Sequence, residues 1–294
     1  MPPDGHDHER PDEGAGSSTT FAAWDRGAVE SRLSALVAAN RFTIAVVFPL
    51  IGGLLLVGSA AGVVPRPLRF NAALVLFGTA VMRLPLIAGL LPAIDRRGAA
   101  GLTALVAFTY AVELLGVTTG VPYGAFEYGV DLGPMLFDAV PLGLPVFYLP
   151  LVLNAYLLTL LLGGRYVDAA AVRLGAALGL VLLVDLVLDP AAVALGFWTY
   201  GGGVYYGVPW TNYAGWTATG LVSLAVVDWS LDRSAVRSRL AACPFMLDDL
   251  VSFTILWAAV NTWAGNAVPV ALAGLLAGAL LRADRFDVAV PSWL

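Results

Sequence analysis

The stretch from Asp185 to Trp216, DLVLDPAAVALGFWTYGGGVYYGVPWTNYAGW, decides the fold and carries the main chemical clue. It begins as an apolar helix with two carboxylates, Asp185 and Asp189, which are four residues apart and therefore share one helix face. We expect this helix to break at Pro190 and to lead into a loop rich in glycine and aromatic residues. Because an Asp that faces lipid is costly, the pair predicts a protein-lined, partly wet cavity inside a membrane.

The composition sets the class of protein. Hydrophobic residues make up 59% of the 294 residues, charged residues make up 13%, and the mean hydropathy is +0.80. These values predict an all-α, polytopic integral membrane protein. All sixteen basic residues are Arg, which excludes a retinal Schiff base and lysine-centred catalysis. Both histidines, His6 and His8, lie in a polar tail and Cys243 is the single cysteine, so we predict no metal site and no internal disulfide.

The chain divides into an N-terminal tail at 1–40 and a transmembrane helical domain at 41–294. The first twenty or so residues are polar and acidic and predict disorder, whereas 24–40 has helical spacing and predicts either an interfacial helix or a lead-in to the first span. Eight apolar segments follow, each near the length that crosses a bilayer core. They predict about eight transmembrane helices at 42–63, 69–91, 100–119, 141–162, 170–194, 214–229, 246–263 and 266–282.

The arginines predict the orientation. They gather before the first segment, after the last one, and in alternate loops such as the one with Arg96 and Arg97, whereas the intervening loops hold only Arg66 and Arg69. Because Arg accumulates on the cytoplasmic side, we expect a multi-pass cell-membrane protein with both termini in the cytoplasm. The two long Arg-free loops, 120–140 and 195–213, then lie together on the extracytoplasmic side.

Three carboxylates are predicted to lie in the membrane near these loops. Glu113 falls inside the third segment and joins Asp185 and Asp189. Burial disfavours the charged form of a carboxylate, so at least one of the three can stay protonated and serve as an acid. Arg83 is the expected counter-ion, and Glu127 is predicted to close over the site from the first Arg-free loop. The alternative is that these acids only bond to neighbouring hydroxyls, amides or Arg83.

Other polar residues have simpler interpretations. We expect Asp131 and Asp138 to be solvated loop acids and Asp228 to mark the cytoplasmic end of the sixth segment. Asn154 and Asn212 are expected to form hydrogen bonds between helices.

Aromatic residues crowd the two Arg-free loops. Tyr and Trp concentrate at membrane interfaces, so an interfacial belt explains some of them. A belt does not require aromatics around Gly201–Gly203, where the backbone can approach a ligand closely. Ring faces stabilise a desolvated cation by about 2 kcal/mol or more per good contact. An acid beside ring faces suits the protonation of an alkene, and the predicted substrate-binding residues are Tyr123, Tyr128, Trp198, Tyr200, Tyr205, Tyr206 and Trp210.

Three blocks of the sequence resemble a known family. VELLGVTTGVPYGAFEYG at 112–129, VPLGLPVFY at 140–148 and the stretch 185–216 are similar to the membrane-embedded carotenoid hydratases typified by bisanhydrobacterioruberin hydratase of haloarchaea. The similarity covers most of 42–282. It implies the addition of water to the terminal carbon–carbon double bonds of an acyclic carotenoid, converting bisanhydrobacterioruberin to bacterioruberin. The expected partners are a carotenoid taken from the bilayer, water and membrane lipids, with no nucleic acid.

The residues and the resemblance together suggest a mechanism. We expect Asp189 or Glu113 to protonate the terminal double bond, and Asp185 or Glu127 to orient the water that captures the resulting tertiary carbocation. This chemistry requires no redox cofactor or nucleotide.

Two other classes of protein remain open. A polyprenyl transferase would bind diphosphate through magnesium and clustered aspartates, and Asp185 and Asp189 are half of such a motif. A carotenoid-binding or transport protein would use the same carboxylates as a proton relay.

Overall fold

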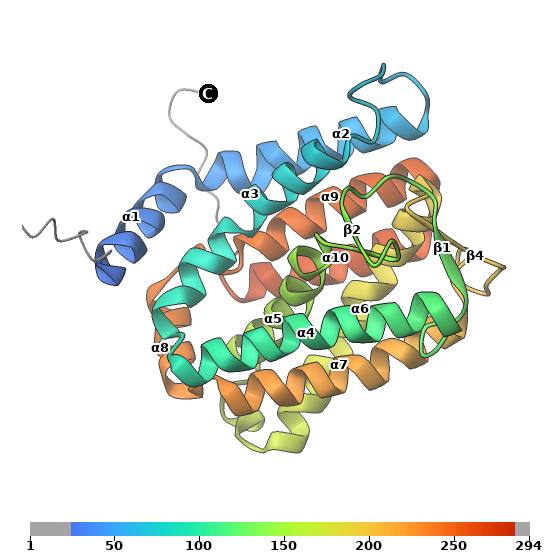
Figure 1. Cartoon of the computed structure of the whole chain (residues 1–294). Helices are drawn as coiled ribbons and strands as arrows, with labels where there is room; N and C mark the ends of the chain where they lie inside the picture. The colour runs from blue at the N-terminus through green and yellow to red at the C-terminus, as the bar shows by residue number, and fades with distance from the viewer. Residues whose placement is uncertain (1–24, 286–294) are drawn as a thin grey trace, which may run out of the picture.

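A computed structural model describes residues 25–285, which form a bundle of α-helices with two short two-stranded sheets at one end (Figure 1). The helices are α1 (Arg26–Ala39), α2 (Phe48–Ala60), α3 (Ala72–Leu90), α4 (Arg96–Thr119), α5 (Leu144–Gly163), α6 (Ala170–Leu195), α7 (Trp210–Ser230), α8 (Arg233–Ala242), α9 (Asp248–Ala264) and α10 (Ala267–Arg282). Short helical turns lie at Thr43–Val47, Leu91–Ala93 and Gly164–Asp168. The strands are β1 (Phe126–Tyr128), β2 (Met135–Leu136), β3 (Val140–Pro141) and β4 (Trp198–Tyr200).

Length and hydropathy make this a membrane helical protein, as the sequence predicts. Five helical segments in the described chain are long and apolar enough to cross a membrane, and they are Thr43–Ala60, Ala72–Ala93, Arg96–Thr119, Leu144–Asp168 and Ala170–Leu195. The three remaining predicted segments fold as α7, α9 and α10, of which α10 is apolar but only 16 residues long. The all-α fold class is therefore confirmed, and these five segments account for most of the predicted spans.

The predicted break at Pro190 is wrong. Helix α6 continues through Pro190 to Leu195 and ends at Gly196, whose φ of 76° is favourable for glycine. A proline has no N–H, so the carbonyl oxygen of Leu186, four residues earlier, loses its helical donor. The hydroxyl of Tyr205 donates to that oxygen instead, at 3.2 Å. An outside donor of this kind allows a membrane helix to keep a proline in its interior.

The two Arg-free loops lie together, as predicted, because they share a sheet that sequence periodicity did not reveal. Strand β1 pairs antiparallel with β4, so that Phe126 lies opposite Tyr200 and Tyr128 lies opposite Trp198. Just beyond the strands, the backbone N–H of Gly129 donates to the carbonyl of Phe197 at 3.0 Å. Figure 1 shows β1 and β4 at the end of the bundle away from α1 and α8.

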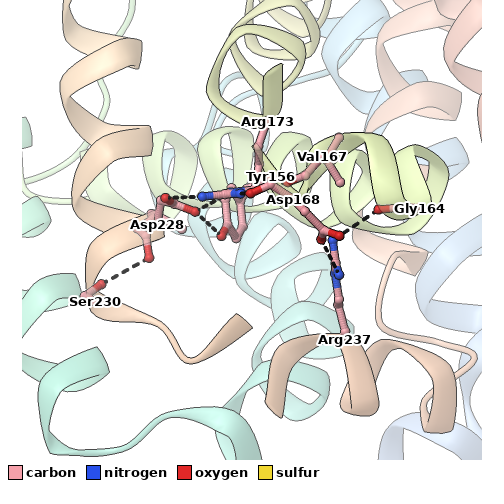
Figure 2. Close-up of polar contacts among 9 residues, drawn as sticks. Tyr156, Gly164, Val167, Asp168, Arg173, Asp228, Ser230 and Arg237 are labelled. Carbon is pink, nitrogen blue, oxygen red and sulfur yellow. Dashed lines mark hydrogen bonds and ion pairs between the residues drawn. The ribbon is translucent and has the colours of Figure 1, made fainter. Parts of the chain in front are cut away.

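An ion pair joins three helices away from these strands. The guanidinium of Arg173, on α6, holds both carboxylate oxygens of Asp228, on α7, at 2.6 and 2.7 Å (Figure 2). Tyr156, on α5, donates to the same carboxylate at 2.6 Å, and Arg173 also donates to the carbonyls of Val167 and Asp168. Because Arg173 is buried, Asp228 fixes the packing of α5, α6 and α7 and does more than mark the end of a segment.

Helix α1 begins beside the end of α3. The carboxylate of Asp25 caps α1 by accepting from the backbone N–H of Gly27, and Arg26 donates to the carbonyls of Leu91 and Ile94 at 2.9 and 2.6 Å. The predicted disordered tail at residues 1 to about 20 lies outside the described residues.

Candidate active site

A cavity of about 160 Å³ lies beneath the β1–β4 sheet, among α3, α4, α5, α6, α7 and α9. This volume is close to that of an apolar protein cavity that accepts a benzene molecule, so it suits the end of a long molecule. Three polar side chains from the helices line it, namely Glu113, Asp189 and Asn212. Most of the remaining wall is aromatic and consists of Phe70, Tyr123, Phe126, Tyr128, Phe147, Tyr148, Phe197, Trp198, Tyr200, Trp216 and Trp257.

Asp185 and Asp189 lie on one face of α6, as their spacing predicts, and both are buried. The side-chain amide of Asn212, on α7, joins them because its Nδ2 donates to Asp189 and lies 3.4 Å from Oδ2 of Asp185. Asp189 lines the cavity, whereas Asp185 lies behind it. Oδ1 of Asp185 is a buried oxygen without a hydrogen-bond partner among residues 25–285. Asn212 therefore bridges two helices, as expected, and also contacts both carboxylates.

Glu113 reaches the same cavity from α4. Its Oε1 accepts a hydrogen bond from the hydroxyl of Tyr128, on β1. Two carboxylates that come from different helices, Glu113 and Asp189, thus line one largely aromatic chamber. Two carboxylates arranged in this way can act on one bound molecule, one as the proton donor and the other as the proton acceptor.

The β1–β4 sheet supplies one tyrosine hydroxyl to Glu113 and another to Asn212. Tyr128 donates to Glu113, and Tyr200, on β4, donates to Oδ1 of Asn212 at 3.1 Å. Burial raises the pKa of Tyr128 and of Tyr200 above the ordinary value, and the neighbouring carboxylates raise both further. Both hydroxyls therefore stay protonated and act as donors. The sheet closes the cavity and also orients the groups that line it.

Aromatic side chains that the sequence analysis did not assign to the site complete the wall. The rings of Tyr148 and Trp216 stack with their centroids 5.1 Å apart, and Tyr123 lies 6.1 Å from Trp216. The hydroxyl of Tyr148 shares a hydrogen bond with Ser223 at 2.9 Å. The available signal was the block at 140–148, which contains Tyr148 and carries part of the family resemblance.

Glu127 does not reach the cavity, which corrects its predicted role. Side chains alternate across a strand, and Phe126 and Tyr128 point into the cavity. Glu127 is consequently exposed on the outer face, opposite the exposed Thr199.

Three predicted substrate-binding aromatics also lie away from the cavity. Tyr206 and Trp210 are exposed, and neither lines the cavity. Tyr205 bonds to Leu186 in α6, and burial raises its pKa to about 12, which keeps the hydroxyl protonated as a donor. Tyr123, Tyr128, Trp198 and Tyr200 do line the cavity.

Arg83 is not the counter-ion of the three carboxylates. Its guanidinium pairs with Asp249, a buried residue in the first turn of α9, and donates to the carbonyl of Val146 at 3.1 Å. Asn154, on α5, donates to the other oxygen of Asp249. Sequence reasoning missed Asp249 because its position at the start of an apolar segment is also typical of an interfacial residue. Within residues 25–285, no ion pair involves Glu113, Asp185 or Asp189.

Comparisons with known proteins identify the family of this chain. The model of the carotenoid biosynthesis protein family matches residues 70–280. The chain belongs to this family. It is also 55% identical over 278 residues to bisanhydrobacterioruberin hydratase of Haloarcula japonica, an alignment that covers 93% of this chain and 95% of the relative. No solved structure matches the chain. The family resemblance inferred from the three sequence blocks is therefore confirmed.

Proposed function

We propose that this chain is a carotenoid hydratase that adds water to the terminal double bonds of bisanhydrobacterioruberin and so produces bacterioruberin. The observation that carries the proposal is the cavity, in which Glu113 and Asp189 face a wall of aromatic rings. The identity of 55% to a bisanhydrobacterioruberin hydratase over nearly the whole chain supports the same activity.

The first step is proton transfer from Asp189 to the alkene. Asp185 and Asp189 share one amide donor, and two like charges so close together disfavour simultaneous ionisation, so the pair holds a proton. Asp189 is the member that lines the cavity, and it protonates the less substituted carbon of the terminal isopropylidene group. The π electrons form the new C–H bond and leave a tertiary carbocation, which the rings of Trp198, Tyr200 and Trp216 face and stabilise.

The second step is capture of the cation by water. Glu113, held by the hydroxyl of Tyr128, orients a water molecule toward the tertiary carbon. The water oxygen forms the C–O bond and Glu113 accepts the released proton, so the product is a tertiary alcohol. Return of that proton to the Asp185–Asp189 pair completes the cycle. Asp185 acts through Asn212 and Asp189, because it lies behind the cavity wall.

The substrate enters sideways from the bilayer. Leu76, on α3, and Phe147, on α5, line the cavity and are partly exposed. An apolar opening between two helices suits a hydrocarbon that is dissolved in lipid. The cavity holds only one end of the carotenoid at a time, so the two ends react in separate binding events.

The membrane arrangement that fits this function has eight spans. In it, α7, α9 and α10 cross the bilayer together with the five segments that are long and apolar enough to do so, and the β1–β4 sheet lies on the extracytoplasmic side. Labelling of single cysteines with a membrane-impermeant maleimide tests this topology in a Cys243→Ser background. Gly201→Cys should react in intact cells, whereas Ala241→Cys, at the exposed end of α8, should react only after lysis. The opposite labelling pattern would contradict the proposed orientation.

Mass spectrometry of pigments tests the activity. A host that accumulates bisanhydrobacterioruberin should gain one water per processed end when it expresses this chain and none when it carries an empty vector. An unchanged pigment profile, with the protein shown to be in the membrane, would overturn the proposed hydratase.

A further inference from the structure

A second cavity, of about 70 Å³, lies along the seam between α2 and α3. The two helices lie next to each other in the upper part of Figure 1. Residues on one face of each helix line this groove, together with the end of the α2–α3 loop and one side chain of α9. They are Phe48, Gly52, Leu55, Leu56 and Ser59 of α2, Leu68 and Phe70 of the loop, Asn71, which caps α3, Leu74, Val75, Gly78, Thr79 and Met82 of α3, and Leu256 of α9.

The groove adjoins the active-site cavity. Phe70 and Val75 line both spaces. The Phe70 ring meets the ring of Phe197, a cavity residue, edge to face at 5.9 Å, and its backbone N–H donates to Oγ of Ser59 at 3.2 Å. Phe70 and Val75 therefore form part of the wall that the two spaces share.

The walls of the groove suit a hydrocarbon. Two of its polar residues are already bonded within the chain, because Ser59 accepts from Phe70 and Asn71 accepts from the backbone N–H of Leu74 at 3.0 Å. The Asn71 amide also donates to the carbonyl of Pro67 at 3.2 Å. Nearly all the remaining lining is apolar, so a polar ligand would find few partners there.

We propose that this groove holds the polyene chain of the carotenoid while the terminal group reacts in the cavity. The proposal rests on the proposed hydratase function. An acyclic carotenoid is stiff because its double bonds are conjugated, and the cavity is large enough only for one end of it. The rest of the molecule must leave the cavity, and the groove on the other side of Phe70 and Val75 is apolar and runs along three turns of α3. The groove thereby selects substrates by the length and straightness of the polyene.

Gly78 gives a direct test. A Cβ at Gly78 would meet no atom within 4 Å, so Gly78→Leu projects into open space without strain and fills the groove. A Cβ at Gly274, on α10, would also meet no atom within 4 Å, and Gly274 lines neither cavity. Gly274→Leu is therefore the matched control. The Gly78→Ala, Gly78→Val and Gly78→Leu series separates groove filling from misfolding, because the effect should grow with side-chain size.

Two readouts with the purified, membrane-reconstituted protein are needed. The Kd for bisanhydrobacterioruberin is measured by its quenching of tryptophan fluorescence, and kcat and KM are measured from hydration. Gly78→Leu should raise Kd and KM about tenfold or more, with kcat within about twofold of the wild type, because the reacting end is untouched. Gly274→Leu should bind and react like the wild type.

Wild-type Kd and KM for Gly78→Leu would overturn the groove proposal, and would indicate that the polyene passes directly into lipid between Leu76 and Phe147 while the groove holds only lipid acyl chains. A wild-type protein that binds the carotenoid but does not hydrate it would instead overturn the proposed function. In that case the comparison of Kd values still decides whether the groove binds the polyene.

Discussion

The hydroxyl of Tyr128 donates a hydrogen bond to Oε1 of Glu113, and this bond joins strand β1 to helix α4 at the wall of the cavity. Because β1 pairs with β4, the same small sheet also carries Tyr200 to the amide of Asn212. The orientation of the site thus depends on two loops that are about seventy residues apart in the sequence.

Removal of the Tyr128 hydroxyl should impair the chemical step. A hydrogen bond to a charged group contributes about 1.5 to 3 kcal/mol, so Tyr128→Phe should lower kcat by about tenfold to a hundredfold if Glu113 orients the attacking water. KM should change little, because the ring remains in the wall. Tyr166→Phe, an exposed tyrosine outside the cavity, is the control and should be inert. Equal kcat values for Tyr128→Phe and the wild type would show that the hydrogen bond from Tyr128 to Glu113 does not contribute to the chemical step.

Loss of the acid at Asp189 should be more severe. General acid catalysis contributes about a hundredfold to ten-thousandfold, so Asp189→Asn should reduce hydration at least a hundredfold, as followed by product formation. Asp185→Asn should retain more activity because Asp185 does not line the cavity. Asp138→Asn, in the exposed part of the loop, is the control. Normal hydration by Asp189→Asn would exclude this residue as the proton donor.

Tyr205 should contribute to stability and not to substrate binding. Its hydroxyl donates to the carbonyl of Leu186, which Pro190 leaves without a helical partner. An unpaired buried acceptor costs about 1 to 3 kcal/mol, so Tyr205→Phe should lower the free energy of unfolding by about that amount and leave KM unchanged.

A double-mutant cycle isolates this effect. Pro190→Ala restores an N–H for the Leu186 carbonyl, so Tyr205→Phe should cost less in the Pro190→Ala background than in the wild type. Equal costs in the two backgrounds would show that Tyr205 acts in some other way.

The ion pair between Arg173 and Asp228 should be essential for packing at its end of the bundle. Removal of one partner of a buried pair costs about 3 to 5 kcal/mol, because the other charge stays buried without compensation. Asp228→Asn should therefore lower the unfolding temperature markedly in detergent, whereas kcat should be preserved in the folded fraction. Arg237→Gln, which breaks the exposed pair with Asp168 beside it in Figure 2, should have a small effect. Similar losses from both variants would contradict this ranking.

Some features of the fold and site could be predicted because they depend on local spacing. Apolar length placed the eight helical segments, and the interval of four residues placed Asp185 and Asp189 on one face. The Arg-free loops were expected together, and the pairing of β1 with β4 confirms it.

Other features depend on tertiary contacts that no local pattern encodes. The register of β1 decides that Tyr128 faces the cavity while Glu127 faces outward. Likewise, Arg83 pairs with Asp249 because α3 packs against α9, a neighbour that the sequence of α3 does not specify. Pro190 was expected to end its helix, but a hydroxyl fifteen residues further along the chain supplies the missing donor.

The most direct test of the central claim is the isotopic composition of the product formed by the purified protein from bisanhydrobacterioruberin. In deuterium oxide enriched with heavy oxygen, protonation followed by water capture predicts one deuterium bound to carbon and one heavy oxygen in each hydrated end. The Asp189→Asn variant should yield neither label. Product that carries heavy oxygen without deuterium bound to carbon, or full labelling by Asp189→Asn, would contradict proton transfer from Asp189 to the alkene.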